Sequence, residues 1–318
     1  MFITEVKQEN GFDKIVLKDT LSKTFVEILP SCGAMLHSFT VLHNGESLNV
    51  IDHYDDAADF KSNVTDKGFK SCKLSPFACR INNATYHFAG TEYTIQKFLL
   101  NESALHGLLY DAVFTILEQY SDEASAGITL KYAYTGTDKG YPFHYDCLVA
   151  YHLKKDNELT VITEIINRDK GLIPIQDGWH PYFQLGGRID ELHLEFQSKE
   201  MVVLNEALIP TGELVAYNEF GSLKQIGEAC FDNCYTMNFA ECQPLCVLRD
   251  IKKNIQIEIR PDKHYPYLQI YTPLHRHSLA IENLSAAPDA FNNKMGLITL
   301  QAGENIIFAT TYKITPLI

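Results

Sequence analysis

One stretch of the sequence places a titratable imidazole among aromatic side chains. It runs Asp177-Gly178-Trp179-His180-Pro181-Tyr182-Phe183 and contains the single tryptophan of the chain. Histidine can give or take a proton around neutral pH, because its unperturbed pKa is about 6.5. The proline that follows disfavours a helix at His180 and removes an N–H from any strand ladder, so we expect a strand edge or a loop. This pattern is typical of an acid–base pocket with apolar walls, although a core histidine bonded to a backbone carbonyl has the same sequence.

A glutamate occupies the middle of an apolar run near the C-terminus, Ala280-Ile281-Glu282-Asn283-Leu284. Glutamate is seldom buried without a partner, so its position calls for a function. Partial burial raises the pKa of a carboxyl group and makes it a better general base near neutral pH. We therefore predict a catalytic role for Glu282.

Three further polar residues stand beside small or aromatic neighbours. The segment Ser75–Ile81 holds Arg80 after an apolar run, His106 precedes Gly107, and Asp232 lies within the aromatic run Phe231–Tyr235. A guanidinium offers a fork of donors to hydroxyl or carboxylate groups, and glycine allows close backbone approach. Taken singly, each also fits an ordinary role: a surface arginine, a core histidine and a turn-forming aspartate.

The composition limits the classes of partner. The chain has 318 residues, 46% of them hydrophobic, and a formal net charge of −13. The acidic balance argues against nucleic acid and anionic membranes as partners, since both require a basic surface. Neither a signal peptide nor an apolar run of membrane-spanning length is apparent, so we expect a cytoplasmic protein that binds a small molecule. The sequence does not indicate an oligomeric state.

The cysteines favour reduced thiols. Eight are scattered through a large chain without an export signal, as is usual in the cytosol. One cluster, Cys230-x3-Cys234-x7-Cys242-x3-Cys246, lacks the C-x2-C spacing of common zinc sites. We therefore expect no metal.

Alternation of apolar and polar residues predicts strands nearly throughout. It is clear over 128–134, 159–165, 192–196 and 255–259, with turn-forming residues between such runs. The one weak helical candidate is the acidic segment Asp52–Phe60. No linker or short repeat divides the chain, so we predict an all-β fold: a single domain over residues 1–318, built as a large antiparallel β-sandwich with few helices.

The order of the short motifs resembles that of the aldose 1-epimerase (galactose mutarotase) family. The resemblance runs from about residue 25 to the C-terminal segment Leu300–Glu304. It rests on the following segments: Arg80-Ile81, Leu105-His106-Gly107, His180-Pro181-Tyr182-Phe183, Asp232, Gln269-Ile270-Tyr271-Thr272, and Glu282 with Pro288-Asp289-Ala290. The resemblance implies a β-supersandwich that needs no metal or organic cofactor.

The resemblance also implies roles for individual residues. The family's base falls on Glu282 and its acid on His180. Its contacts to sugar hydroxyls fall on Arg80, His106, Asp232 and Gln269. Mutarotation removes a proton from the anomeric hydroxyl while another is delivered to the ring oxygen, and an acid and a base on opposite sides of the sugar would suffice. A bell-shaped pH profile is then expected, with its acidic limb from Glu282 and its basic limb from His180.

Trp179, Tyr182 and Phe183 are expected to offer the sugar an apolar face or to support the loop. One departure from the family is Cys79, where many members have asparagine before the Arg-Ile pair. The link between Tyr271 and Glu282 is also short, which should open the rim of the pocket.

Two other functions stay open. A non-catalytic sugar-binding protein could use the same scaffold, although a pure binder needs no matched acid and base. A hexose-6-phosphate epimerase would require basic residues at the pocket rim, for which the run His275-Arg276-His277 is the nearby candidate.

Overall fold

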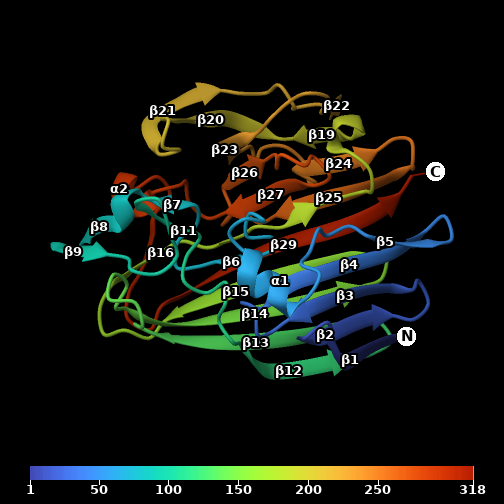
Figure 1. The fold of residues 1–318 in the computed structure, drawn as a ribbon, viewed down its shortest axis with the longest axis horizontal. Helices are drawn as coiled ribbons and strands as arrows, with labels where there is room; N and C mark the ends of the chain where they lie inside the picture. The colour runs from blue at the N-terminus through green and yellow to red at the C-terminus, as the bar shows by residue number, and fades with distance from the viewer. Residues whose placement is uncertain (318) are drawn as a thin grey trace.

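The computed structural model describes residues 1–317, which are built mainly of antiparallel strands (Figure 1). The N-terminal sheet consists of β1 (Phe2–Glu9), β2 (Phe12–Asp19), β3 (Thr24–Leu29), β4 (Met35–His43) and β5 (Glu46–Asn49), in that order. It packs on the start of the largest sheet, where β1 contacts β12 and β2 contacts β13 and β14.

The largest sheet crosses the molecule. Its order is β12 (Thr115–Ser121), β13 (Ser125–Thr135), β14 (His144–Lys154), β15 (Glu158–Asn167), β29 (Asn305–Pro316), β25 (Ile255–Pro261), β24 (Cys246–Asp250), β19 (His193–Phe196) and β22 (Lys224–Gln225). Every second residue of β15 is buried, as expected for a strand that covers a core on one face. The four strands predicted from alternation correspond to β13, β15, β19 and β25, so those predictions are confirmed.

A third sheet carries most of the candidate site. Its order is β21 (Pro210–Ala216), β20 (Ser198–Leu204), β23 (Asp232–Met237), β26 (Tyr267–Tyr271), β27 (Leu279–Leu284), β17 (Gly178–Trp179) and β6 (Lys73–Leu74), and β18 (Tyr182–Phe183) also pairs with β27. Strands far apart in the sequence are thus neighbours in this sheet. Figure 1 shows the β20–β21 hairpin at its outer edge.

The remaining elements are short. They are β10 (Leu99–Leu100), β11 (Ser103–Leu105) and β7 (Arg80–Ile81) in one small sheet, the pairs β8 (Thr85–Phe88) with β9 (Thr91–Thr94) and β16 (Ile173–Ile175) with β28 (Ile298–Leu300), the helices α1 (Ala57–Asn63) and α2 (Ala290–Asn293), and the 3-10 turns Asn82–Ala84 and Ile189–Glu191. The largest hydrophobic cluster draws residues from Phe2 to Ile314 and so connects the ends of the chain. The all-β fold with few helices is confirmed.

The helix predicted at Asp52–Phe60 begins later, at Ala57. Asp56 caps its N-terminus, because its carboxylate accepts a hydrogen bond from the N–H of Asp59 at 2.7 Å. The carboxylate of Asp52 is instead held by the ammonium group of Lys70 at 2.6 Å. The first part of the predicted segment lies outside the helix, whose N-terminus is set by the extended backbone and the capping side chain of Asp56. Within residues 1–317, no helix combines the length and apolarity needed to cross a membrane.

Candidate active site

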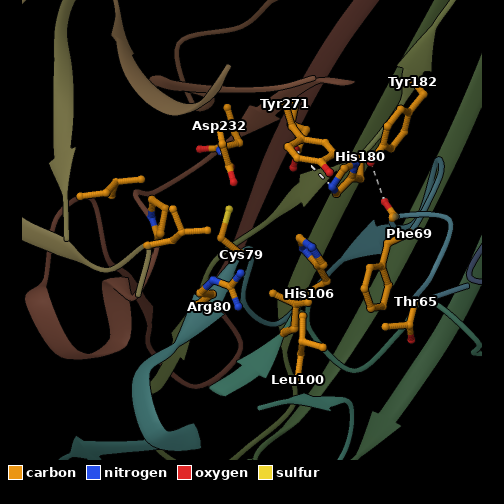
Figure 2. A pocket seen from close by; sticks show the side chains of 17 residues that line it. Thr65, Phe69, Cys79, Arg80, Leu100, His106, His180, Tyr182, Asp232 and Tyr271 are labelled. Carbon is orange, nitrogen blue, oxygen red and sulfur yellow. Dashed lines mark hydrogen bonds and ion pairs between the residues drawn. The ribbon is translucent and has the colours of Figure 1, made fainter. Parts of the chain in front are cut away.

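A pocket of about 260 Å³ brings together the six residues predicted as acid, base and hydroxyl-binding groups (Figure 2). Its wall is formed by Thr65, Gly68, Phe69, Cys79, Arg80, Leu100, Leu105, His106, His180, Tyr182, Leu204, Leu208, Asp232, Gln269, Tyr271, Glu282 and Pro288. Polar side chains converge there from the third sheet and from the small β7–β11 sheet, which is the usual arrangement of a small-molecule site.

Three of the polar residues come from neighbouring strands. Glu282 on β27 is the register partner of Gln269 on β26. Asp232 begins β23, and its carboxylate accepts a hydrogen bond from the side-chain amide of Gln269 at 3.0 Å. Adjacent positions on antiparallel strands place side chains on the same face, so the sheet itself assembles this group.

His180 lies between β17 and β18, in the non-helical conformation that the following proline predicts. Its backbone N–H donates to the carbonyl of Cys72 at 3.1 Å, and its carbonyl accepts from the N–H of Ser71 at 2.8 Å. The imidazole stacks on the Tyr182 ring, 5.1 Å away between centroids, and meets His106 edge-on at 4.9 Å. The ring is thus fixed by both its backbone and its neighbours.

Arg80 and His106 approach from the small sheet. Leu105 is the register partner of Arg80, and the N–H of His106 donates to the carbonyl of Cys79 at 2.8 Å. The Cys79 side chain lines the pocket, and Figure 2 shows its sulfur directed toward Asp232. The position at which this chain departs from the family therefore faces the site.

Several wall residues have left-handed backbone conformations. The φ angles are +56° at Phe69, +52° at Cys79, +60° at His106 and +59° at Leu208. This region is unfavourable for residues with a Cβ, and such strain tends to occur at functional sites. Gly107 follows with φ +80°, and a Cβ there would lie 2.4 Å from the Ser75 carbonyl oxygen. The turn that presents His106 therefore requires glycine at its next residue.

The imidazole of His180 touches the carboxyl group of Glu282, with 3.3 Å between Nε2 and Oε1. The expectation that these two groups lie on opposite sides of a sugar was therefore wrong for this structure. Both side chains are buried, at 6% and 1% exposure. Burial lowers the pKa of His180 to about 3 and, with a smaller contribution from Asp232, raises the pKa of Glu282 well above its usual range.

Burial consequently favours an uncharged imidazole beside a protonated carboxyl group over two opposite charges at this contact. These pKa directions reverse the order expected from the sequence, in which the carboxyl group titrates first. His106 is also neutral, because burial and then His180 and Arg80 hold its pKa well below the usual value. Burial raises the pKa of Asp232 as well, and Arg80 opposes that rise.

Several buried polar atoms of the pocket have no partner among residues 1–317. They are Nδ1 of His106, Nδ1 of His180, Oε1 of Gln269 and Oε2 of Glu282. Buried polar groups are normally hydrogen-bonded, so a cluster of unpaired ones in a single pocket favours a polar ligand. Together they supply donors and acceptors in the arrangement that a polyhydroxylated molecule needs.

Of the three aromatic residues expected near His180, Tyr182 lines the pocket, and its hydroxyl donates to the carbonyl of Gly68 at 2.9 Å. Trp179 and Phe183 do not line it. Trp179 packs in the core with its indole N–H 3.3 Å from Thr163, and Phe183 packs on Tyr312. A sugar-stacking role for these two is wrong, because alternation along the chain turns their side chains inward.

Sequence reasoning missed part of the wall. Phe69 and Leu100 line one side, and Leu204 and Leu208 from the β20–β21 hairpin line another. The sequence does not distinguish these apolar residues from ordinary core residues, because only the tertiary fold brings them to the pocket.

The basic run His275-Arg276-His277 does not contribute to the pocket wall. The Arg276 guanidinium is held by Asp190 and by the carbonyls of Gly227 and Ala229. The wall carries two carboxyl groups and a single guanidinium, Arg80, within residues 1–317. This charge balance does not favour a phosphorylated sugar.

The four clustered cysteines are divided between the surface and the core. Cys230 and Cys242 are exposed, and Cys234 and Cys246 are buried. No group of three or more histidine, cysteine, aspartate or glutamate side chains in residues 1–317 is placed to hold a metal.

The aldose 1-epimerase family profile matches residues 13–313. The chain belongs to the aldose 1-epimerase family. Among its relatives, it is 21% identical over 313 residues to the maltose epimerase of Levilactobacillus brevis, covering 89% of each chain. It is 28% identical over 244 residues to the uncharacterized protein YihR of Escherichia coli, covering 73% of this chain and 74% of YihR.

Solved structures of the same fold match almost the whole chain. A galactose mutarotase-like protein from Clostridium acetobutylicum superposes with a TM-score of 0.86 at 16% identity and covers 99% of both chains. The galactose 1-epimerase of Lactobacillus acidophilus superposes with a TM-score of 0.81 at 19% identity, covering 100% of this chain and 99% of the other. The family that the motifs resembled is therefore confirmed, and family membership supports a carbohydrate epimerase.

Proposed function

We propose that this protein interconverts the α and β anomers of a free aldohexose by general acid–base ring opening. Glu282 and His180 exchange the protons, and Arg80, His106, Asp232 and Gln269 bind the sugar hydroxyls. The observation that carries the proposal is the 3.3 Å contact between the His180 imidazole and the Glu282 carboxyl group in a buried pocket. A purely binding site has no need of a matched acid and base.

The adjacency of the two groups suits this reaction. The anomeric hydroxyl oxygen and the ring oxygen are bonded to the same carbon. An acid and a base in contact can therefore reach both oxygens from one side. The two groups lie side by side rather than on opposite sides of the sugar, but the reaction still needs the same two proton transfers.

The pair carries one proton over the pH range between the two perturbed pKa values. With this proton on His180, the Glu282 carboxylate takes the proton of the anomeric hydroxyl and the imidazolium protonates the ring oxygen. The C–O bond of the ring breaks, and the aldehyde then faces a neutral imidazole and a protonated carboxyl group. Rotation about the C1–C2 bond followed by the reverse transfers closes the ring as the other anomer.

Burial favours the neutral form of the pair, since charges are costly to desolvate. Ring opening therefore converts the less stable charged pair into the more stable neutral pair. Ring opening thereby returns the free energy that proton transfer from Glu282 to His180 cost beforehand, and the enzyme is left in its favoured neutral form.

The substrate range is open within free aldoses. The wall offers hydroxyl-binding groups and a single cation, which supports an uncharged sugar. The maltose epimerase relative makes a reducing disaccharide a second sugar to test. We also infer that residues 1–318 act as one domain in the cytoplasm; the shared hydrophobic core supports the former.

The test is polarimetry on freshly dissolved α-glucose, α-galactose and β-maltose. We expect the protein to accelerate the change of optical rotation toward equilibrium for at least one of them. The matched controls are Glu282→Gln and His180→Asn at equal concentration. Saturable sugar binding without any acceleration would identify a non-catalytic binding protein, and acceleration confined to hexose 6-phosphates would contradict the free-sugar assignment.

A further inference from the structure

An ion pair that is not part of the pocket wall lies on the strands that carry the candidate site. The Lys73 ammonium on β6 is 2.6 Å from each carboxylate oxygen of Asp177, which precedes β17, and both side chains are fully buried. Burial raises the pKa of Asp177, and Lys73 opposes that rise. A buried ion pair contributes little net stability compared with apolar residues of similar volume. Stability alone therefore does not account for its presence.

The Lys73 ammonium group contacts the segment that precedes His180. Beyond Asp177, it donates to the carbonyl of Gly178 at 3.1 Å and lies 4.5 Å from the centre of the Trp179 ring. It thus contacts the three residues that immediately precede the imidazole. Backbone hydrogen bonds join the same two segments, because His180 is bonded to Ser71 and Cys72, the residues just before Lys73.

The backbone of Asp177 is hydrogen-bonded to the residue that follows the Glu282 strand. Its backbone N–H donates to the Ser285 hydroxyl at 2.8 Å, and its carbonyl accepts from the N–H of Ser285 at 2.9 Å. Ser285 is three residues after Glu282 and directly follows β27. The Tyr265 hydroxyl donates to the Asp177 carboxylate at 2.8 Å from outside these strands. Asp177 is therefore connected to both sides of the acid–base contact.

We propose that the buried Lys73–Asp177 ion pair is a positioning device, which holds the His180 segment against the Glu282 strand and so sets the contact between the imidazole and the carboxyl group. On the side before His180 the ladder to the Glu282 strand is short, because β17 is only two residues long and pairs with β27 at a single position, Gly178 with Leu284. After His180, β18 pairs with β27 at Tyr182 and Phe183. The ion pair adds a directional bond between Lys73 on β6 and Asp177 before β17, and the backbone of Asp177 is in turn bonded to Ser285 at the end of β27. Reacting groups displaced by about 1 Å can lose on the order of 10²-fold in rate, so this constraint matters for catalysis.

This inference rests on the proposed function, and the experiment separates the two. The variant Lys73→Met/Asp177→Asn removes both charges with little change of volume. The matched control is Lys14→Met/Glu27→Gln, which removes a partly buried ion pair, 3.3 Å between Nζ and Oε2, from β2 and β3 outside the pocket wall. Both are compared with the wild type by anomerisation kinetics and by thermal unfolding.

We expect kcat to fall about tenfold or more in the Lys73→Met/Asp177→Asn variant, with KM within about threefold of the wild type. The control should keep both constants. Unchanged kcat overturns the proposal, and so does a rise of KM with kcat retained, because that result would assign the pair to sugar binding. If the double variant does not fold, Lys73→Met alone decides: it breaks the ion pair and leaves a carboxyl group whose pKa burial already raises, so that it can take up a proton, and an unchanged kcat overturns the proposal.

A readout without turnover keeps the two hypotheses distinct. The ring resonances of His180, assigned by their loss in His180→Asn, should not shift between about pH 5 and 8 in the wild type, because the imidazole is held neutral. In Lys73→Met/Asp177→Asn they should titrate, as the ring leaves its buried contact. Absence of activity in the wild type would refute the proposed function, whereas identical His180 titrations in variant and wild type would refute the positioning role.

Discussion

Replacement of the buried carboxyl group by an amide, Glu282→Gln, tests both the chemistry and the electrostatics of the site. The amide keeps the shape of the side chain but cannot accept a proton. Loss of a general base typically costs about 10²–10⁴ in rate, which corresponds to about 3–5 kcal/mol of transition-state stabilisation. We therefore expect kcat to fall by that factor, with sugar affinity within a few fold.

The same substitution should alter the pH dependence of stability. Burial raises the pKa of Glu282 in the folded protein, whereas the unfolded chain has the ordinary value of 4.5. Below about pH 4.5 both states are protonated and the carboxyl group costs nothing. As the pH rises, the unfolded wild type releases its proton and the folded state keeps it, so the wild type loses about 1.4 kcal/mol per pH unit up to the raised pKa. The amide that replaces the carboxyl group in the variant does not titrate.

At about pH 6.5, two units above the unfolded-state pKa, this effect should therefore make the variant more stable than the wild type by at most about 3 kcal/mol. Unfolding entropy scales with chain length, so this difference corresponds to roughly 4 °C in Tm for a chain of this size. Differential scanning calorimetry at about pH 4.5 and 6.5, with polarimetry on the same samples, measures both effects. Wild-type turnover by the variant would refute the base assignment. A Tm difference that does not grow with pH would show that Glu282 is ionised in the folded protein.

Three further outcomes are expected. His180→Asn should lose turnover but be less destabilised by acid than the wild type. A folded-state pKa of about 3 makes the wild type lose stability as the pH falls below the unfolded-state pKa of 6.5. Equal falls of Tm in variant and wild type on acidification would contradict this. The pH profile of kcat should be bell-shaped, with its acidic limb near the His180 pKa of about 3 and its basic limb at the raised pKa of Glu282. A basic limb near pH 6.5 that is lost in His180→Asn would instead assign the basic limb to His180. Cys79→Asn should lower KM about two- to tenfold by adding one hydrogen bond to the sugar, and asparagine tolerates the φ of +52° there; an unchanged KM with a lower Tm would place that side chain away from the ligand.

The sequence by itself determined the fold class and predicted six residues that the structure brings into one pocket. Strand periodicity required an all-β protein, and an apolar run around Glu282 required a buried carboxyl group with a raised pKa. The proline after His180 excluded a helix there. Each of these follows from local chemistry, because side-chain alternation and backbone restrictions act within a few residues. The single domain and the cytoplasmic location stay predictions.

Only the tertiary structure decided how these groups meet. The 3.3 Å contact of His180 with Glu282 depends on the register of strands about a hundred residues apart, and a slip of one residue would turn the side chains to the opposite face. The same long-range pairing placed Trp179 in the core, where sequence reasoning expected a sugar-stacking face. Burial then fixed the charge states, since desolvation depends on everything packed around a group rather than on its neighbours in the chain.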